Sequence, residues 1–358
     1  MPGWLSWTAG AEEDQEAILK RLGIRHYGDE DILAMPIERL REEFGYETTT
    51  GIKLTFFFRN VIWQLYEFIK AGKPPDFYHK RGFVRGMWYH IKTRISRYKQ
   101  LRGHYYGTMS AVLASLVREG LFSYKDFNFR DRDQAMRMLG TENRHIIIFS
   151  EKDGFISIME TIAETYGCTA VTLGGIPSFL SSNYMVSEMA DAGFPMAEKF
   201  YCFSIVDFDP AGDNAAEEFI KQLTSSGLRN FHLFDQYGAK YPRLDLARPA
   251  NLTGGDIDAI KYNLPASVQR AQQTADWAKR TGGVDGKGSR KYGLESDEFT
   301  EERIYALVEA SIAPYLKTDP EVVKRRVTMR KLQDAIEDFM VEKILHPDPP
   351  PQPHVARA

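Results

Sequence analysis

The stretch HIIIFSEKDGFISIMETIAETYGCTAVTLGG, residues 145–175, contains the repeating unit of an α/β fold. Residues 145–149 form a continuous apolar run, which is typical of a strand buried on both faces of a parallel sheet. Residues 156–163 place apolar side chains on one face of a helix, and residues 170–173 form a second apolar run. A strand, a helix and a second strand in this order predict two parallel strands joined by a right-handed crossover.

The same alternation continues along the chain. We expect helices at residues 178–192 and 211–223, and strands at residues 201–206 and 231–234. With the first two strands they predict a parallel four-stranded sheet flanked by helices. We therefore expect a multidomain α/β protein in which residues 143–346 hold this sheet and a helical C-terminal elaboration.

The part of the chain that precedes the sheet lacks this alternation. Residues 1–75 predict a helical N-terminal region that ends at a pair of prolines, which marks a domain boundary. Residues 76–142 predict two helices, at 83–95 and 108–118, followed by a short hairpin at 122–129. Helix, helix and hairpin is the order expected of a winged-helix DNA-binding domain.

The composition excludes several classes of protein. With 358 residues, 43% of them hydrophobic and 27% charged, the chain suits two or three soluble globular domains. No apolar run reaches the length of a membrane span and the first residues do not resemble a signal peptide, so we expect no membrane partner. Two cysteines, Cys168 and Cys202, are too few for a disulfide framework or a zinc site, which favours a reducing compartment such as the cytoplasm and nucleoid, or the nucleus in a eukaryote. The Pro-rich residues 347–358 are expected to be disordered.

Basic residues are concentrated in one segment. The net charge of -3 argues weakly against nucleic acid, but residues 77–118 contain no Asp or Glu and many Lys and Arg residues, with aromatic residues between them. This pattern is typical of a surface that contacts a phosphate backbone, although a solvated basic face has the same pattern. The candidate DNA-binding residues of this segment are Lys80, Arg81, Lys92, Arg94 and Arg97.

Acidic residues follow two of the predicted strands. Glu151 comes directly after the first strand, and Asp207 and Asp209 come after the third. Because the carboxyl ends of parallel strands meet at one edge of a sheet, and because alternate residues of an extended chain point to the same side, we expect the three carboxylates to converge. An Asp-x-Asp pair alone also occurs by chance in turns. Lys152, next to Glu151, could contact phosphate or solvent.

Three converging carboxylates predict a metal site. Like charges at close range raise each other's pKa, and a divalent cation offsets that repulsion. Oxygen ligands with room for water favour Mg²⁺, which completes its coordination with phosphate oxygens. The expected chemistry is phosphoryl transfer.

Residues 145–235 resemble the Toprim domain of topoisomerases, primases and related nucleases. IIIFSEKDGF, residues 146–155, resembles the glutamate motif of that domain, and IVDFDPAGD, residues 205–213, resembles its Asp-x-Asp motif. The segment between them, AVTLGGIPSFLSSNYM at residues 170–185, is similar to that of the topoisomerase VI A subunit and its relatives, the meiotic double-strand-break transesterases. A winged helix before Toprim is also the order of that group, and the resemblance covers roughly residues 76–310.

The resemblance implies a reaction and partners. It implies a type IIB topoisomerase A-subunit-like enzyme that cleaves and rejoins double-stranded DNA through a 5′-phosphotyrosyl intermediate, assisted by Mg²⁺ held by Glu151, Asp207 and Asp209. Each protomer would cut one strand, so a homodimer is expected. The sequence contains no phosphate-binding loop of the Gly-x-x-x-x-Gly-Lys-Ser/Thr type, so ATP use is expected of a GHKL-type ATPase B subunit in trans.

The resemblance also implies a tyrosine nucleophile. The stretch VRGMWY, residues 84–89, matches the nucleophile motif of the group, which puts Tyr89 at the nucleophile position and Arg85 at the motif arginine. A phenol has a pKa near 10 and needs activation, and a guanidinium four residues away on a helix could steady a phenolate. Gly86 and Trp88 depart from the motif, which usually has an acidic or polar residue and a tyrosine there.

Three interpretations of the chain stay open at this point. The first is the DNA transesterase with Tyr89 as nucleophile, although Tyr89 could also be a core tyrosine, and Tyr105 and Tyr106 compete for its role. The second is a Toprim nuclease that uses water. The third is a DNA-binding partner subunit without catalytic activity.

Overall fold

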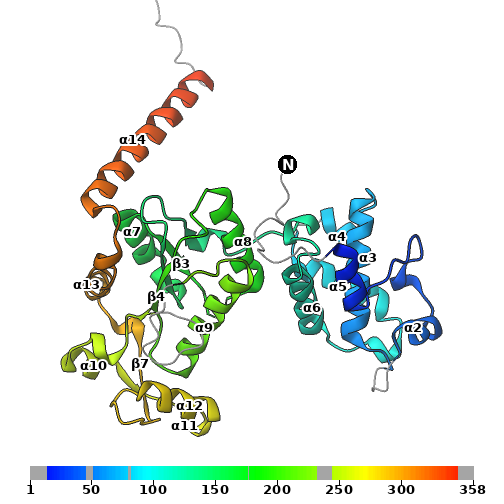
Figure 1. Ribbon diagram of the computed structural model, residues 1–358, viewed down its shortest axis with the longest axis horizontal. Coiled ribbons are helices and arrows are strands. Elements are labelled where there is room, and N and C mark those ends of the chain that lie inside the picture. Colours follow the sequence, from blue (N-terminus) through cyan, green and yellow to red (C-terminus); the bar gives the residue numbers. More distant parts are fainter. Residues whose placement is uncertain (1–13, 46–50, 80–81, 176, 232–243, 346–358) are drawn as a thin grey trace, which may run out of the picture. The chain divides into compact units, whose positions relative to one another are not determined.

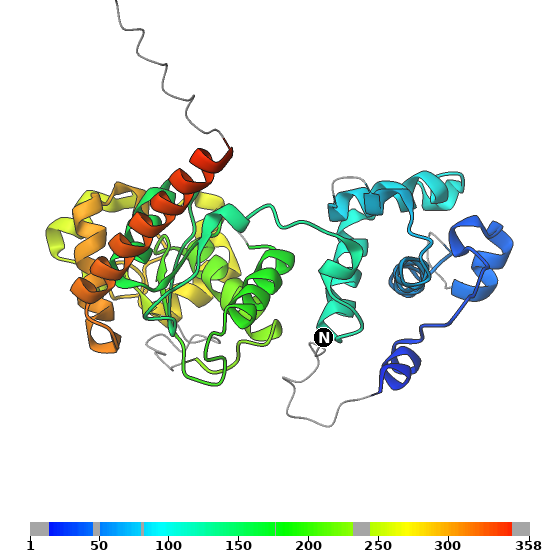
Figure 2. The same ribbon diagram turned by 90° about the horizontal axis from the view of Figure 1, so that it is seen from above.

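The structure is a computed structural model that describes residues 14–45, 51–79, 82–175, 177–231 and 244–345. The chain groups into two compact units (Figures 1 and 2). Unit 1 comprises residues 1–134, 178–186 and 222–229, and unit 2 comprises residues 135–177, 187–221 and 230–358.

Unit 1 is helical and has one hydrophobic core. Its helices are α1 (Gln15–Leu22), α2 (Ile37–Phe44), α3 (Leu54–Lys70), α4 (Asp76–His79), α5 (Val84–Ile95) and α6 (Tyr106–Arg118). In α3 the apolar residues recur at helical spacing, so that Phe57, Phe58 and Leu65 are each buried. This helix packs against α6, where Met109 and Leu116 are also buried. The two helices predicted for residues 76–142 are therefore present as α5 and α6.

The hairpin predicted at residues 122–129 is wrong. The chain forms a 3₁₀ helix there, η4 (Tyr124–Phe127), which begins with a capping box between Ser123 and Asp126. The Ser123 amide donates to Asp126 Oδ2 over 2.8 Å, and the Asp126 amide donates to Ser123 Oγ over 3.3 Å. The aromatic side chains of this segment, Phe122, Tyr124, Phe127 and Phe129, are buried. Among the described residues of this segment we identify no winged helix.

Unit 2 contains a mixed, mostly parallel sheet. Its strands are β1 (Arg137–Met138), β2 (Ile146–Ser150), β3 (Thr169–Thr172), β4 (Tyr201–Ile205) and β5 (Leu244–Asp245), in the spatial order β1-β3-β2-β4-β5. Strands β3, β2, β4 and β5 are parallel to their neighbours, whereas β1 is an antiparallel edge strand that the sequence did not suggest. The strand predicted at 231–234 lies mostly outside the described residues, and Phe231 forms an isolated parallel bridge with Phe200.

Helices cover both faces of this sheet. They are α7 (Ile156–Tyr166), α9 (Pro210–Ser225) and α13 (Glu301–Ile312), whereas α8 (Phe179–Asp191) is divided between the two units. Because strand residues alternate between faces, Ile146 and Ile148 join the core that α7 and α13 cover, whereas Phe149 contacts Phe219 of α9 with ring centroids 4.8 Å apart. Figure 1 shows α7 and α9 on opposite sides of the strands.

The C-terminal part of unit 2 adds a second, smaller sheet. Its elements are α10 (Gly254–Ile260), β6 (Lys261–Asn263), α11 (Ala266–Arg270), α12 (Gln272–Thr281) and β7 (Tyr292–Leu294), followed after α13 by α14 (Pro320–Leu345). Strands β6 and β7 are antiparallel, and Phe208, Trp277 and Leu294 form a small core beside them. Backbone hydrogen bonds of 3.0 and 3.3 Å join Phe208 to Leu294. This bridge holds the segment after β7 against the segment after β4.

None of the described helices combines the length and the hydropathy that a membrane span requires.

Candidate active site

The three predicted carboxylates lie at one edge of the sheet. Strands β2 and β4 are parallel neighbours, and their register pairs Ser150 with Ile205. The residues that follow these strands therefore leave the sheet side by side, and the amide of Glu151 donates to the carbonyl of Ile205 over 3.3 Å. Asp207 and Asp209 follow within four residues, close enough for both charges to act on Glu151.

Glu151 is half-buried and incompletely bonded. Its Oε2 atom is buried and has no hydrogen-bond partner in the described part of the chain. Burial and the charges of Asp207 and Asp209 raise the pKa of Glu151 to about 7, against the opposing effects of Lys152 and of the Asp207 amide. Near neutral pH this carboxyl group therefore takes up a proton readily. A cation bound at Oε2 would offset the negative charge of the three carboxylates in place of that proton.

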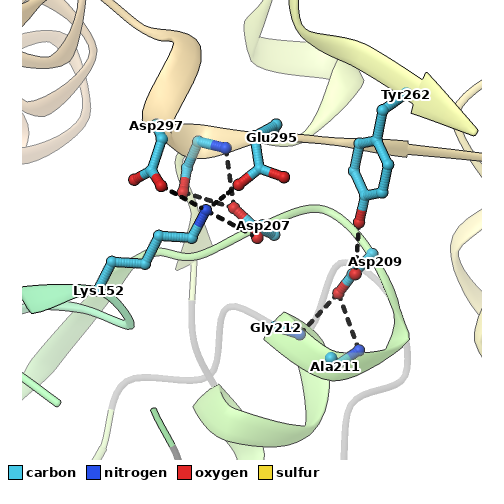
Figure 3. Close-up of polar contacts among 9 residues, drawn as sticks. Lys152, Asp207, Asp209, Ala211, Gly212, Tyr262, Glu295 and Asp297 are labelled. Atoms are coloured by element: carbon cyan, nitrogen blue, oxygen red, sulfur yellow. Dashed lines mark hydrogen bonds and ion pairs between the residues drawn. The ribbon is translucent and has the colours of Figure 1, made fainter. Parts of the chain in front are cut away.

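Asp209 is held by the start of a helix and by a distant tyrosine. Its Oδ1 atom accepts hydrogen bonds from the amides of Ala211 and Gly212, over 2.8 and 2.7 Å, so it caps α9. Its Oδ2 atom accepts a 2.6 Å hydrogen bond from the hydroxyl of Tyr262 in β6 (Figure 3). A Cβ atom on Gly212 would lie 2.3 Å from the carbonyl oxygen of Asp207, which explains the glycine of the Asp-x-Asp-Pro-x-Gly motif.

Asp207 is held by Ser296, which follows β7. Its Oδ1 atom accepts hydrogen bonds from the amide and the hydroxyl of Ser296, over 2.8 and 2.7 Å. Its Oδ2 atom lies 3.1 Å from the Nζ atom of Lys152. Both oxygens of this carboxylate therefore have partners in the protein.

Lys152 is surrounded by carboxylates. Besides Asp207 it forms ion pairs with Glu295 and with Asp297, the latter over 3.0 Å (Figure 3). Burial alone would lower the pKa of the Lys152 ammonium group, but the hydrogen bonds that it donates to Glu295 and Asp297, and the charge of Asp207, raise it above its ordinary value. The predicted phosphate contact of Lys152 would require this ammonium group to leave at least one of these partners.

Sequence reasoning missed the residues of the C-terminal segment. Tyr262, Glu295, Ser296 and Asp297 reach the site only because the bridge between Phe208 and Leu294 brings their segment to the sheet. The acidic run that contains Glu295 and Asp297 is visible in the sequence, but nothing local links it to Asp207, which lies 89 residues before Ser296. Long-range contacts of this kind have no signal in a single sequence.

The carboxylate oxygens of Glu151, Asp207 and Asp209 are ligands of the kind that a hard divalent cation prefers, but most of them already have partners in the protein. In this structure the described residues include no group of three or more His, Cys, Asp or Glu side chains that could hold a metal ion. The oxygens of Asp207 and Asp209 are used by Ser296, Lys152, Tyr262 and helix α9. The buried, unpartnered Oε2 of Glu151 is the atom that a cation would satisfy, and Mg²⁺ prefers such oxygen ligands. Metal binding would therefore need Lys152 to release Asp207.

The candidate nucleophile lies on α5 in unit 1. Tyr89 is 55% exposed, so it is not a core tyrosine. The guanidinium of Arg85 lies over the ring of Tyr106, 5.8 Å from its centroid, and the described residues show no hydrogen bond or cation–π contact between Arg85 and Tyr89. Tyr105 and Tyr106 are partly buried against the core of unit 1.

The two departures from the nucleophile motif have different structural settings. Trp88 is 2% exposed and packs near Phe58, with ring centroids 6.4 Å apart, so this residue fills the core. A Cβ atom on Gly86 would meet Phe77 at 3.8 Å, an ordinary contact, so packing does not require glycine there.

The predicted DNA-binding residues of unit 1 have unequal surroundings. Lys80 and Arg81 lie outside the described residues. Arg94 contacts Nδ1 of His90 over 2.9 Å, and Arg97 donates to the carbonyls of Leu33 and Met35 over 2.9 and 3.1 Å. Lys92 is half-buried on α5. Arg97 thus binds its own chain in this structure.

No protein-family model matches this chain, and no curated protein matches it, so its function rests on the geometry described above.

Proposed function

We propose that this protein is a DNA transesterase like the A subunit of type IIB topoisomerases. The observation that carries the proposal is the unpartnered, buried Oε2 atom of Glu151, beside Asp207 and Asp209 at the carboxyl edge of a mostly parallel sheet. A carboxylate cluster in this position of an α/β sheet fits a divalent cation and a phosphate. The exposed Tyr89 on a basic helix supplies the second part of the chemistry.

In this proposal the hydroxyl oxygen of Tyr89 attacks a DNA phosphorus atom. An O–P bond to the tyrosine forms and the bond from phosphorus to the 3′ oxygen breaks. The phenolic proton passes to solvent, and the 3′ oxygen takes up a proton from solvent to leave as a hydroxyl group. The reverse reaction rejoins the strand. Mg²⁺, when held by Glu151, Asp207 and Asp209, would stabilise negative charge on the phosphate oxygens.

The proposal includes partners and a place of action. Two protomers would cut the two strands of double-stranded DNA, and a GHKL-type ATPase B subunit would act in trans. The protein would work where the DNA is, in the nucleoid or in a nucleus. Lys92, Arg94 and Arg97 would contact the DNA backbone, for which Arg94 and Arg97 would have to exchange their present partners.

The test is the covalent adduct. The protein is incubated with supercoiled DNA and Mg²⁺, denatured, and examined for protein bound to 5′ ends. We expect adducts with the wild type and with Tyr105→Phe, and none with Tyr89→Phe or Asp207→Asn. Adducts at wild-type level with Tyr89→Phe would contradict the assignment of the nucleophile.

A second candidate is a nuclease that uses water at the same carboxylates. The position of Arg85 over Tyr106, rather than beside Tyr89, favours this alternative. It predicts nicked DNA with unblocked ends, cleavage retained in Tyr89→Phe, and cleavage lost in Asp207→Asn. A third outcome is that an Asp207→Asn, Asp209→Asn double variant keeps the adducts and nicks of the wild type. That result would favour a subunit that does not use this site.

A further inference from the structure

Helix α14 extends away from the rest of unit 2. The helix spans 26 residues, and its first turns are attached to the unit through buried Val323 and through ion pairs of Arg326 with Glu142 and of Lys331 with Glu164. Every residue from 328 to 341 is exposed. Figure 1 shows the end of this helix (red) leaving the unit without a covering element.

The exposed part of α14 carries an apolar stripe. Its side chains are more than half exposed, at Met329 66%, Leu332 56%, Ile336 54%, Phe339 56% and Met340 54%. The first four are spaced by three, four and three residues, which is the a/d seam of a two-stranded coiled coil. A shallow groove runs along this stripe and is also lined by Arg325, Gln333 and Glu337. A contiguous apolar stripe of this kind marks an interaction surface.

The charges of α14 indicate which partner covers the stripe. The first half of the helix is basic on balance, because Lys324, Arg325, Arg326, Arg330 and Lys331 outnumber Glu321. The second half is acidic on balance, because Asp334, Glu337, Asp338 and Glu342 outnumber Lys343. A second copy of the helix that runs antiparallel places each basic half beside an acidic half. A parallel copy places like charges together.

We propose that α14 pairs with α14 of a second copy of this chain in an antiparallel coiled coil. With a two-fold axis near residue 334, Met329 of one copy packs against Phe339 of the other, and Leu332 against Ile336. Each copy presents the same surface in a two-fold symmetric interface, so the pairing uses both surfaces and gives a dimer rather than a larger assembly. The inference rests on α14 alone and does not require the proposed reaction.

Sedimentation of the full chain tests the pairing. We expect the wild type to sediment as a dimer, and Leu332→Gln, Ile336→Gln as a monomer with unchanged helix content in circular dichroism. Asp334→Gln is the control, because residue 334 lies on the side of the helix opposite the seam, and it should remain dimeric. A monomeric wild type, or a double variant with the mass of the wild type, overturns the proposal.

Spin labels test the orientation. The native Cys168 and Cys202 are buried, so a label at Lys324→Cys reacts selectively. In the antiparallel pair the two labels lie about 30 Å apart along the helix, from a rise of about 1.5 Å per residue. A parallel pair would bring the labels to about 10 Å, the spacing of neighbouring helix axes, and would contradict the proposed orientation. Glu337→Lys with Asp338→Lys should weaken an antiparallel dimer at least tenfold, and unchanged affinity would also count against it.

Discussion

The hydroxyl of Tyr262 donates a 2.6 Å hydrogen bond to Oδ2 of Asp209, across 53 residues of sequence. Asp209 is only 9% exposed, and its other oxygen caps helix α9. A buried carboxylate held at both oxygens keeps one orientation, because any rotation breaks bonds that water cannot replace. The end of β4 therefore places Asp209 at the edge of the sheet, and Tyr262 of the C-terminal segment holds its carboxylate in one orientation.

The first prediction concerns this hydrogen bond. Tyr262→Phe keeps the ring in the small core but leaves Oδ2 of Asp209 without its donor, which should lower the free energy of unfolding by about 1–3 kcal/mol. Urea denaturation measures the change. Tyr292→Phe is the matched control on the neighbouring strand, where the ring lies near Lys261, and it should change the free energy by less than about 0.5 kcal/mol. Equal effects of the two variants would show that the hydroxyl of Tyr262 contributes nothing to stability.

The second prediction concerns pH. Burial and the neighbouring Asp207 and Asp209 raise the pKa of Glu151 from 4.5 to about 7. The folded protein therefore keeps a proton that the unfolded chain releases, and the stability that this proton confers is complete below pH 4.5 and lost as the pH rises through 7. Without divalent ions, the free energy of unfolding should fall over this window. Glu151→Gln cannot titrate and should have a smaller slope.

Urea denaturation in a chelating buffer, at several values between pH 5 and 8, measures this slope. The control is Glu160→Gln, an exposed residue of α7, which should keep the wild-type slope. At the upper end of the range Glu151→Gln should be more stable than the wild type. A variant less stable than the wild type at pH 8 would mean that the Glu151 carboxylate is favourably bonded when ionised.

The convergence of Glu151, Asp207 and Asp209 at one edge could be predicted because it depends on local patterns. Apolar runs define the strands, and parallel strands align their carboxyl ends. The partners of these acids could not be predicted, because Tyr262 and Ser296 reach them through tertiary contacts across 53 and 89 residues. The same limit explains Lys152, whose partners Glu295 and Asp297 come from that distant segment.

One prediction was wrong, and one residue has partners that the sequence does not reveal. The hairpin expected near Phe122 does not form, because the Ser123 to Asp126 capping box makes a 3₁₀ helix there, and local hydrogen bonds outweigh strand propensity in so short a segment. The basic segment was interpreted from charge alone, which does not reveal that Arg97 donates to carbonyls of its own chain.

The third prediction concerns the turn that follows Asp209, at the start of α9. In Gly212→Ala the new methyl group would lie 2.3 Å from the carbonyl oxygen of Asp207, so the turn must shift and the cap of α9 must weaken. We expect a lower melting temperature. Gly254→Ala is the control, because Gly254 also lies in the first turn of a helix and a Cβ atom there meets nothing within 4 Å. Alanine at that position should be neutral or stabilising by up to about 1 kcal/mol. Equal melting temperatures for the two variants would show that the turn tolerates a side chain.

The last prediction concerns Lys152, whose ammonium group lies among Asp207, Glu295 and Asp297. Lys152→Gln removes the charge and leaves three carboxylates facing one another, so the melting temperature in a chelating buffer should fall. Added Mg²⁺ should raise it by more in the variant than in the wild type, because the cation no longer competes with the lysine for Asp207. Lys317→Gln, which breaks the exposed pair with Glu198, is the control and should respond to Mg²⁺ like the wild type. A variant that is destabilised but insensitive to Mg²⁺ would separate the two roles of this cluster: the lysine would be a structural counter-ion, and the carboxylates would not form a cation site.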